Sequence, residues 1–138
     1  MSADLQWLLI RNNHSFLVKR DGVQFSSERG NVANVNSFKF SGLANPTAVD
    51  VSVSNNNVVL STKRAKNAQK PNAQWASNTL KAYRKGSKFT GADAVERATS
   101  QSYYRSDLSR YALARYTALN RSLSLKPRKA KRVRRRKK

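Results

Sequence analysis

The chain has 138 residues and a formal net charge of +21, because 28 lysines and arginines face only seven acidic residues. Residues 1–60 are nearly balanced, whereas residues 61–138 carry almost all of the excess charge and repel themselves unless a polyanion neutralises them. The absence of cysteine excludes disulfides, thiolate metal sites and a cysteine nucleophile. With 38% hydrophobic residues, the length fits one small domain with extensions.

The most densely apolar stretch is Leu5–Arg20, and we expect the core to be built on it. Leucines three and four positions apart predict a helix that begins near Ser2 and ends at Asn12-Asn13, where short polar amides favour a turn. Phe16–Val18 then predicts a buried strand. Residues 21–26 predict a tight Asp-Gly turn and a second strand, which together complete a hairpin.

A polar loop is expected over residues 27–36, followed by a short strand or extended segment at residues 38–40. A second hairpin is the clearest β signal, because residues 48–53 alternate valine with polar residues, residues 55–57 are three asparagines and residues 58–63 return. Four aromatic residues with apolar neighbours are expected in the core: Trp7, Phe16, Phe38 and Phe40.

The composition changes after Lys63, where lysine and arginine are spread through alanine, asparagine, glutamine and serine. We expect an extended basic arm there, with a short helix near Ala76–Tyr83. A sequence similar to a capping box at residues 90–93 predicts a helix to about Tyr103, and Ser106 is a suitable N-cap for a second helix.

The second of these helices is predicted to be amphipathic. Its apolar stripe consists of Leu108, Ala112, Tyr116 and Leu119, and Arg115 falls beside that stripe. Arg110 and Arg121 lie on the opposite face. Ten of the last thirteen residues are basic, so the tail is expected to be disordered when free. It also matches a nuclear-import pattern of low specificity.

These elements predict an α+β fold. Residues 1–64 form a core domain with a small N-terminal helix and an antiparallel sheet, and residues 65–89 form the basic extended arm. Residues 90–121 form the helical segment with two helices, and residues 122–138 form the basic tail.

The sequence offers little for catalysis. The single histidine, His14, has no second histidine or cysteine with which to complete a metal site, and the acidic residues are scattered. We therefore expect no enzyme activity, no cofactor and no small-molecule substrate. The apolar run Leu5–Ile10 is too short to span a bilayer, and Asp4 precedes it where a signal peptide carries positive charge.

Polyanion binding is the function that the charge favours, because each phosphate neutralised by lysine or arginine releases condensed counterions. Long basic arms suit an irregularly folded RNA, although a histone-like DNA-binding protein or a cationic membrane-active protein remain alternatives. Trp75 either stacks on an unpaired base, fills a pocket on another protein or packs locally. The candidate RNA-binding residues are Lys63, Arg64, Lys66, Lys70, Trp75, Lys81, Arg84, Lys85, Lys88, Arg105, Arg110, Arg121, Arg128, Lys129, Lys131, Arg132, Arg134, Arg135 and Arg136.

Several short segments, in order along the chain, are similar to one known family. They are Leu5-Gln6-Trp7, Arg11-Asn12, Ser15-Phe16-Leu17, Lys19-Arg20, Asn36-Ser37-Phe38-Lys39-Phe40 with Gly42-Leu43, Lys70-Pro71, Tyr104-Arg105-Ser106-Asp107-Leu108 and the basic end. On these residues the chain resembles the eukaryotic large-subunit ribosomal protein family L28e. The similarity is weaker between Arg64 and Ser102.

The resemblance implies a structural component of the large (60S) ribosomal subunit with no catalytic residues. It implies large-subunit ribosomal RNA and neighbouring ribosomal proteins as partners, and a cytoplasmic ribosome with nuclear or nucleolar transit during assembly as the location. A nuclear ribosome-assembly factor of the same superfamily has a similar front domain and is the alternative. That factor looks longer, with cysteines and an acidic region that this chain lacks.

Overall fold

The computed structural model of the chain describes residues 2–80, 84–85 and 88–124, with the backbone alone for residues 84, 85, 88–90 and 124. Its elements are α1 (Ala3–Ile10), β1 (Leu17–Arg20), β2 (Val23–Ser26), β3 (Val49–Ser54), β4 (Asn57–Lys63), the 3₁₀ turn η1 (Ala65–Asn67), β5 (Trp75–Leu80), β6 (Arg84–Lys85), β7 (Lys88–Phe89), α2 (Thr90–Glu96), the π-helical turn η2 (Arg97–Gln101), the 3₁₀ turn η3 (Ser106–Leu108) and α3 (Ser109–Ser124). The α+β class is therefore confirmed.

Both predicted hairpins are present and antiparallel. Ser54 pairs with Asn57, so Asn55 and Asn56 form a two-residue turn with φ values of 49° and 61°. This left-handed backbone matches the twist of the strands, and asparagine tolerates it better than most residues. Asp21 at φ 46° and Gly22 at φ 78° form the corresponding turn between β1 and β2.

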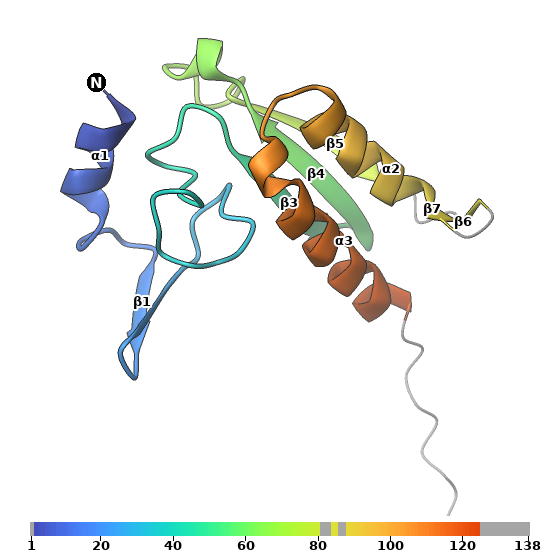
Figure 1. Ribbon diagram of the computed structural model, residues 1–138, viewed down its shortest axis with the longest axis horizontal. Helices are drawn as coiled ribbons and strands as arrows, with labels where there is room; N and C mark the ends of the chain where they lie inside the picture. Colours follow the sequence, from blue (N-terminus) through green and yellow to red (C-terminus); the bar gives the residue numbers. More distant parts are fainter. Residues whose placement is uncertain (1, 81–83, 86–87, 125–138) are drawn as a thin grey trace, which may run out of the picture.

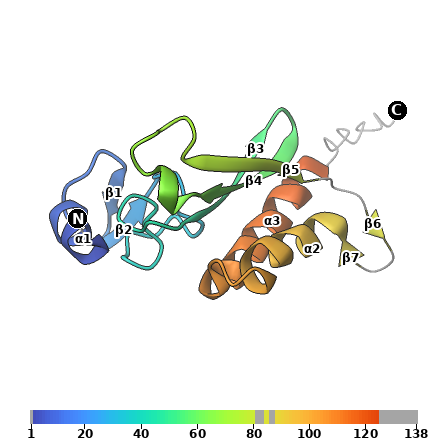
Figure 2. The ribbon, with the colours of Figure 1, turned by 90° about the horizontal axis from the view of Figure 1, so that it is seen from above.

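The core lies between a three-stranded sheet, in the order β3-β4-β5, and the helices α2 and α3, which cover one face of it (Figure 2). Alternate residues of the strands point to that face, because side chains on a strand have a period of two. The predicted stripe on α3 is confirmed, since it meets the sheet. The buried apolar cluster is Val32, Val49, Val51, Val58, Leu60, Leu80, Val95, Leu108, Ala112 and Tyr116.

The prediction that Leu5–Arg20 carries the core is wrong. Ser2 does cap α1, with its Oγ accepting from the Leu5 N–H at 3.3 Å, but α1 contains no buried residue. Leu8 and Leu9 are 62% and 66% exposed. A stretch rich in apolar residues can be buried only if another part of the protein packs against it. The helix-facing side of the sheet is already filled by α2 and α3, and α1 lies at the far end of the molecule (Figure 1).

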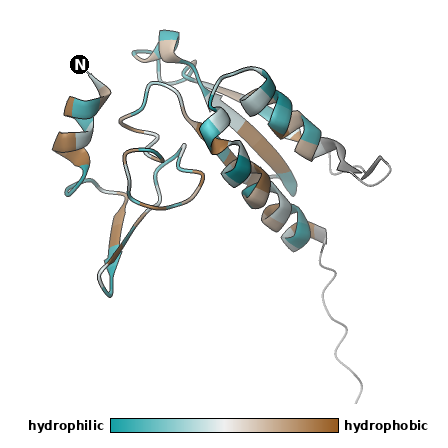
Figure 3. Cartoon of the chain, viewed as in Figure 1, coloured by the Kyte–Doolittle hydropathy of each residue, from teal (hydrophilic) through white to brown (hydrophobic). Residues whose placement is uncertain are grey.

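The four aromatic residues expected in the core lie outside the buried cluster. Phe16 is 41% exposed, and Trp7 contacts Phe38 with their ring centroids 6.0 Å apart. Phe40 is half-buried against the cluster and meets Tyr111 edge to face at 4.9 Å. Figure 3 shows that apolar residues occur in two places, on α1 and β1 at one end of the molecule and in the central sheet.

The predicted short helix near Ala76–Tyr83 is wrong over its described part. Residues up to Leu80 belong to β5, which pairs with β4 from Lys63↔Trp75 to Val58↔Leu80. The free backbone N–H and C=O groups on this edge of β4 form hydrogen bonds with residues 75–80. This pairing with β4 overrides the weak helical preference of the segment. Residues 38–40 form a turn rather than an extended segment. The helix expected from residue 90 is present as α2 and η2, and the tail 122–138 lies almost wholly outside the described residues.

Arg115 joins α3 to the outer edge of the sheet. Its Nε donates to the Val51 carbonyl at 2.7 Å, and its Nη1 donates to the Val32 carbonyl at 3.1 Å and to Asn34 Oδ1 at 2.9 Å. One planar guanidinium therefore satisfies acceptors on β3 and on the preceding loop. These hydrogen bonds explain why Arg115 lies beside the apolar stripe of α3.

We predict that Arg115→Lys lowers the free energy of unfolding by about 1–3 kcal/mol, because one ammonium cannot serve all three acceptors. Arg110→Lys on the exposed face of the same helix is the matched control and should change stability little. Urea unfolding followed by circular dichroism measures both. Equal stability of the two variants would contradict the assignment.

Gly91 permits the close approach of α2 to α3. A Cβ at this position would lie 2.5 Å from Cζ of Tyr116, whose side chain is 1% exposed and has no room to move aside. We therefore predict that Gly91→Ala destabilises the fold by about 1–3 kcal/mol, despite the better helix propensity of alanine. Tyr116→Phe should be nearly neutral in the same urea experiment, since the hydroxyl has no hydrogen-bond partner among the described residues. A neutral Gly91→Ala would contradict this packing.

Candidate nucleic-acid interface

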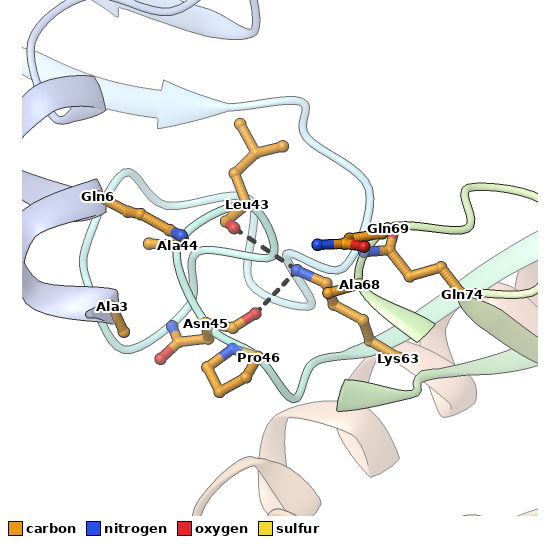
Figure 4. A pocket seen from close by; sticks show the side chains of 10 residues that line it. All are labelled: Ala3, Gln6, Leu43, Ala44, Asn45, Pro46, Lys63, Ala68, Gln69 and Gln74. Atoms are coloured by element: carbon orange, nitrogen blue, oxygen red, sulfur yellow. Dashed lines mark hydrogen bonds between the residues drawn. The ribbon is translucent and has the colours of Figure 1, made fainter. Parts of the chain in front are cut away.

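Lys63 was predicted to bind RNA, but the structure buries it to 8% exposure. Its Nζ donates to the carbonyls of Gly42 at 2.7 Å and Asn45 at 2.8 Å (Figure 4 draws the bond to Asn45). Burial lowers the pKa of Lys63, and the nearby Glu28 carboxylate opposes that shift. The ammonium is committed to the fold, so we leave Lys63 out of the phosphate-binding surface.

Arg105 is also held by the fold, with a side chain that is 15% exposed. Its Nε and Nη2 donate to the two carboxylate oxygens of Asp107, each at 2.9 Å. The same guanidinium donates to the carbonyls of Thr47 at 2.8 Å and Lys39 at 2.9 Å. The neighbouring Tyr104 hydroxyl accepts from the Ala48 N–H at 3.2 Å. The segment 104–108 is therefore a joint between the helices and the loop before β3.

Trp75 is half-buried and packs against residues 29 and 30, and its stacking on an unpaired base stays a prediction. The Arg29 guanidinium lies 4.6 Å from the centre of the indole. Gly30 lies against the ring edge, because a Cβ on Gly30 would come within 2.6 Å of the Trp75 Cη2. The sequence around Trp75 contains no sign of these neighbours, which lie more than forty positions away.

The exposed candidates cluster in the chain around η1. Arg64, Lys66 and Lys70 are all exposed, and no acidic group pairs with them within the described residues. Arg110 and Arg121 are exposed on α3. The side chains of the remaining candidates lie outside the described residues: Lys81, Arg84, Lys85, Lys88, Arg128, Lys129, Lys131, Arg132, Arg134, Arg135 and Arg136.

A cleft of about 510 Å³ opens beside this basic segment, between α1, the loop 43–46 and the turn 68–74 (Figure 4). Side-chain amides line it, and the lysine at its floor is Lys63. A second hollow of about 290 Å³, lined by residues 66–70, shares Ala68 and Gln69 with the cleft. No carboxylate lines either hollow. Sequence reasoning missed the amides contributed by Gln6, Asn45, Gln69 and Gln74.

Other chemistry has little support in the part of the chain that the structure describes. No group of three histidine, cysteine, aspartate or glutamate side chains there could hold a metal ion. His14 is half-buried, its ring lies 6.4 Å from that of Phe16, and its Nδ1 has no hydrogen-bond partner among these residues. None of the described helices is long and apolar enough to cross a membrane.

The joint at segment 104–108 makes stability depend on pH. Hydrogen bonds from Arg105 lower the pKa of Asp107 below 3.8, its ordinary value. A lowered carboxyl pKa contributes stability above the unfolded value, and that contribution is lost as the pH falls through the folded value.

We therefore predict that Asp107→Asn is less stable than wild type at about pH 7 and that the difference narrows below about pH 3.8. Urea unfolding across this range measures it. Asp21→Asn, at the exposed tip of the first hairpin, serves as the control, because asparagine keeps the left-handed turn. A gap for Asp107→Asn that stays constant down to strongly acidic pH would refute the prediction.

The comparisons with known proteins agree with the resemblance. The sequence matches the Ribosomal L28e protein family over residues 5–122. The large ribosomal subunit protein eL28 of Schizosaccharomyces pombe is 39% identical over 132 residues, covering 86% of this chain and 90% of that protein.

Two further relatives of the same name match over shorter stretches. The Dictyostelium discoideum protein is 46% identical over 71 residues and the Caenorhabditis elegans protein 50% identical over 68 residues. These alignments cover 51% and 48% of this chain, and 54% of each relative, so the chain spans about half the length of these two. The family match covers the sheet and both helices that pack on it, and the chain belongs to the ribosomal L28e protein family.

Proposed function

We propose that this protein is a structural constituent of the large ribosomal subunit that binds and stabilises ribosomal RNA through phosphate contacts. The observation that carries the proposal is the match to the L28e family over residues 5–122. The similar proteins from other organisms are named as large ribosomal subunit proteins. The net charge of +21 supports it, because a chain so basic requires a polyanion around it. The role is architectural rather than enzymatic.

We assign the phosphate contacts to basic residues whose side chains are exposed. Arg64, Lys66 and Lys70 lie together around η1, and Arg110 and Arg121 lie on the solvent side of α3. Each contact releases counterions and adds affinity without reading sequence. The same role is proposed for the basic residues whose side chains lie outside the described residues: Lys81, Arg84, Lys85, Lys88, Arg128, Lys129, Lys131, Arg132, Arg134, Arg135 and Arg136.

Neighbouring ribosomal proteins complete the set of proposed partners. The proposed location is the cytoplasmic ribosome, with nuclear and nucleolar transit during assembly of the subunit. The family relatives carry the name of a large-subunit protein, which supports this location over that of a chromatin protein.

The proposal predicts that the tagged protein sediments with large subunits and polysomes in a sucrose gradient and remains there after a moderate-salt wash. A magnesium chelator, which disassembles ribosomes, should shift it from polysomes to lighter particles. Sedimentation only with nuclear pre-ribosomes would identify an assembly factor instead. Migration with chromatin or as free protein would reject the ribosomal role.

Lys66→Ala should weaken binding to a structured RNA without changing base preference. The slope of log K against log salt concentration should fall by about 0.7–0.9, because one phosphate contact is lost. Fluorescence anisotropy at several potassium chloride concentrations measures this slope. Lys66→Arg keeps the charge and should keep the slope. An unchanged slope for Lys66→Ala would remove Lys66 from the surface.

A further inference from the structure

The cleft beside η1 is suited to more than phosphate. We propose that it receives one unpaired nucleotide base of the bound RNA, with its amide side chains on the edge of the base and the adjacent lysines on the phosphate. The inference rests on the proposed RNA binding and adds to it a site that recognises a base.

Three of the side-chain amides that line the cleft are available to a ligand. Gln6 projects from α1, and Gln69 and Gln74 project from the opposite wall (Figure 4). None of these three side-chain amides makes a hydrogen bond within the described part of the chain. Each amide offers one acceptor and two donor hydrogens, which is the combination that pairs with the edge of a nucleobase. Three such groups around one cavity have no evident role in the fold.

The size and walls of the cleft fit a planar heterocycle. Its volume of about 510 Å³ leaves room for a base and the start of its ribose. Leu43 and Pro46, both exposed, supply apolar surface for the face of the ring. Proteins that recognise single-stranded RNA combine an apolar face and hydrogen bonds to the base edge in this way.

The cleft is held in place before any ligand arrives. The Lys63 ammonium binds the carbonyls of Gly42 and Asn45, and the Asn45 amide donates to the carbonyls of Phe38 at 2.6 Å and Ser41 at 2.9 Å. These bonds fix the 43–46 wall, so little conformational entropy is lost when a base enters.

The charge around the cleft selects a nucleotide over an uncharged ring. The second hollow, lined by Lys66 and Lys70, shares Ala68 and Gln69 with the cleft. A nucleotide whose base enters the cleft can therefore place its phosphate between the two lysines. A base inside a regular duplex cannot reach the cleft, so the ligand is a bulged or looped-out nucleotide.

The test is chemical probing of large subunits from cells whose only copy of this protein is wild type or carries Gln69→Ala and Gln74→Ala. Dimethyl sulfate and a water-soluble carbodiimide together modify the Watson–Crick edges of all four bases. One unpaired nucleotide should be protected in wild type and become roughly tenfold more reactive in the double variant, as expected when a bidentate contact is lost. The matched control is Gln101→Ala, an exposed glutamine on η2, which should leave this nucleotide protected.

Two measurements distinguish failure of the base-binding site from failure of the proposed ribosomal function. Identical reactivity at every nucleotide, with the variant protein present in the subunits, would overturn the base site and leave phosphate binding intact. Absence of the wild-type protein from large subunits would overturn the proposed function itself. If the double variant is not retained in large subunits, ultraviolet cross-linking of wild-type subunits tests the base-binding site instead. A nucleotide attached to Gln6, Gln69 or Gln74 supports the site, whereas the absence of any nucleotide from these three residues overturns it.

Discussion

The buried ammonium of Lys63 is the contact on which the front of the molecule depends. The segment between β2 and β3 is long and contains no strand of its own, so its backbone carbonyls need donors from elsewhere. Lys63, at the end of β4, supplies them to Gly42 and Asn45. Glu28, 4% exposed and bonded to Asn31 and Ser41, places a compensating negative charge nearby. Desolvating this pair is costly, and removing either partner alone would leave an uncompensated buried charge.

Two arginines connect the helices to that framework. Arg105 binds Asp107 and two loop carbonyls at the corner between η2 and α3, and Arg115 binds the edge of β3. The segment Tyr104–Leu108, which also supports the family resemblance, is thus an architectural joint. Hydrogen bonds within the protein account for the arginine and the aspartate of this segment. A basic residue in this family therefore has to be placed in the structure before it is assigned to phosphate.

The described residues include apolar side chains that no other described part of the protein covers and basic side chains that no described acidic group neutralises. Leu5, Leu8 and Leu9 on α1 are exposed, and the basic residues around η1 lack acidic partners among the described residues. A surface that is apolar at one end and strongly basic elsewhere is typical of a protein that completes its environment in an assembly. The proposed place in the large ribosomal subunit would supply that environment.

The sequence by itself determined the α+β class, both hairpins and the stripe of Leu108, Ala112 and Tyr116, because turn chemistry and side-chain periodicity are local. It also carried the family identity in short ordered segments. Only the tertiary structure decided where the core lies, that residues 75–80 join the sheet, and which cations are used internally. The bonds of Lys63 to Gly42 and of Arg105 to Lys39 span 21 and 66 positions. Burial and pairing depend on such distant neighbours, and no local pattern in the chain records them.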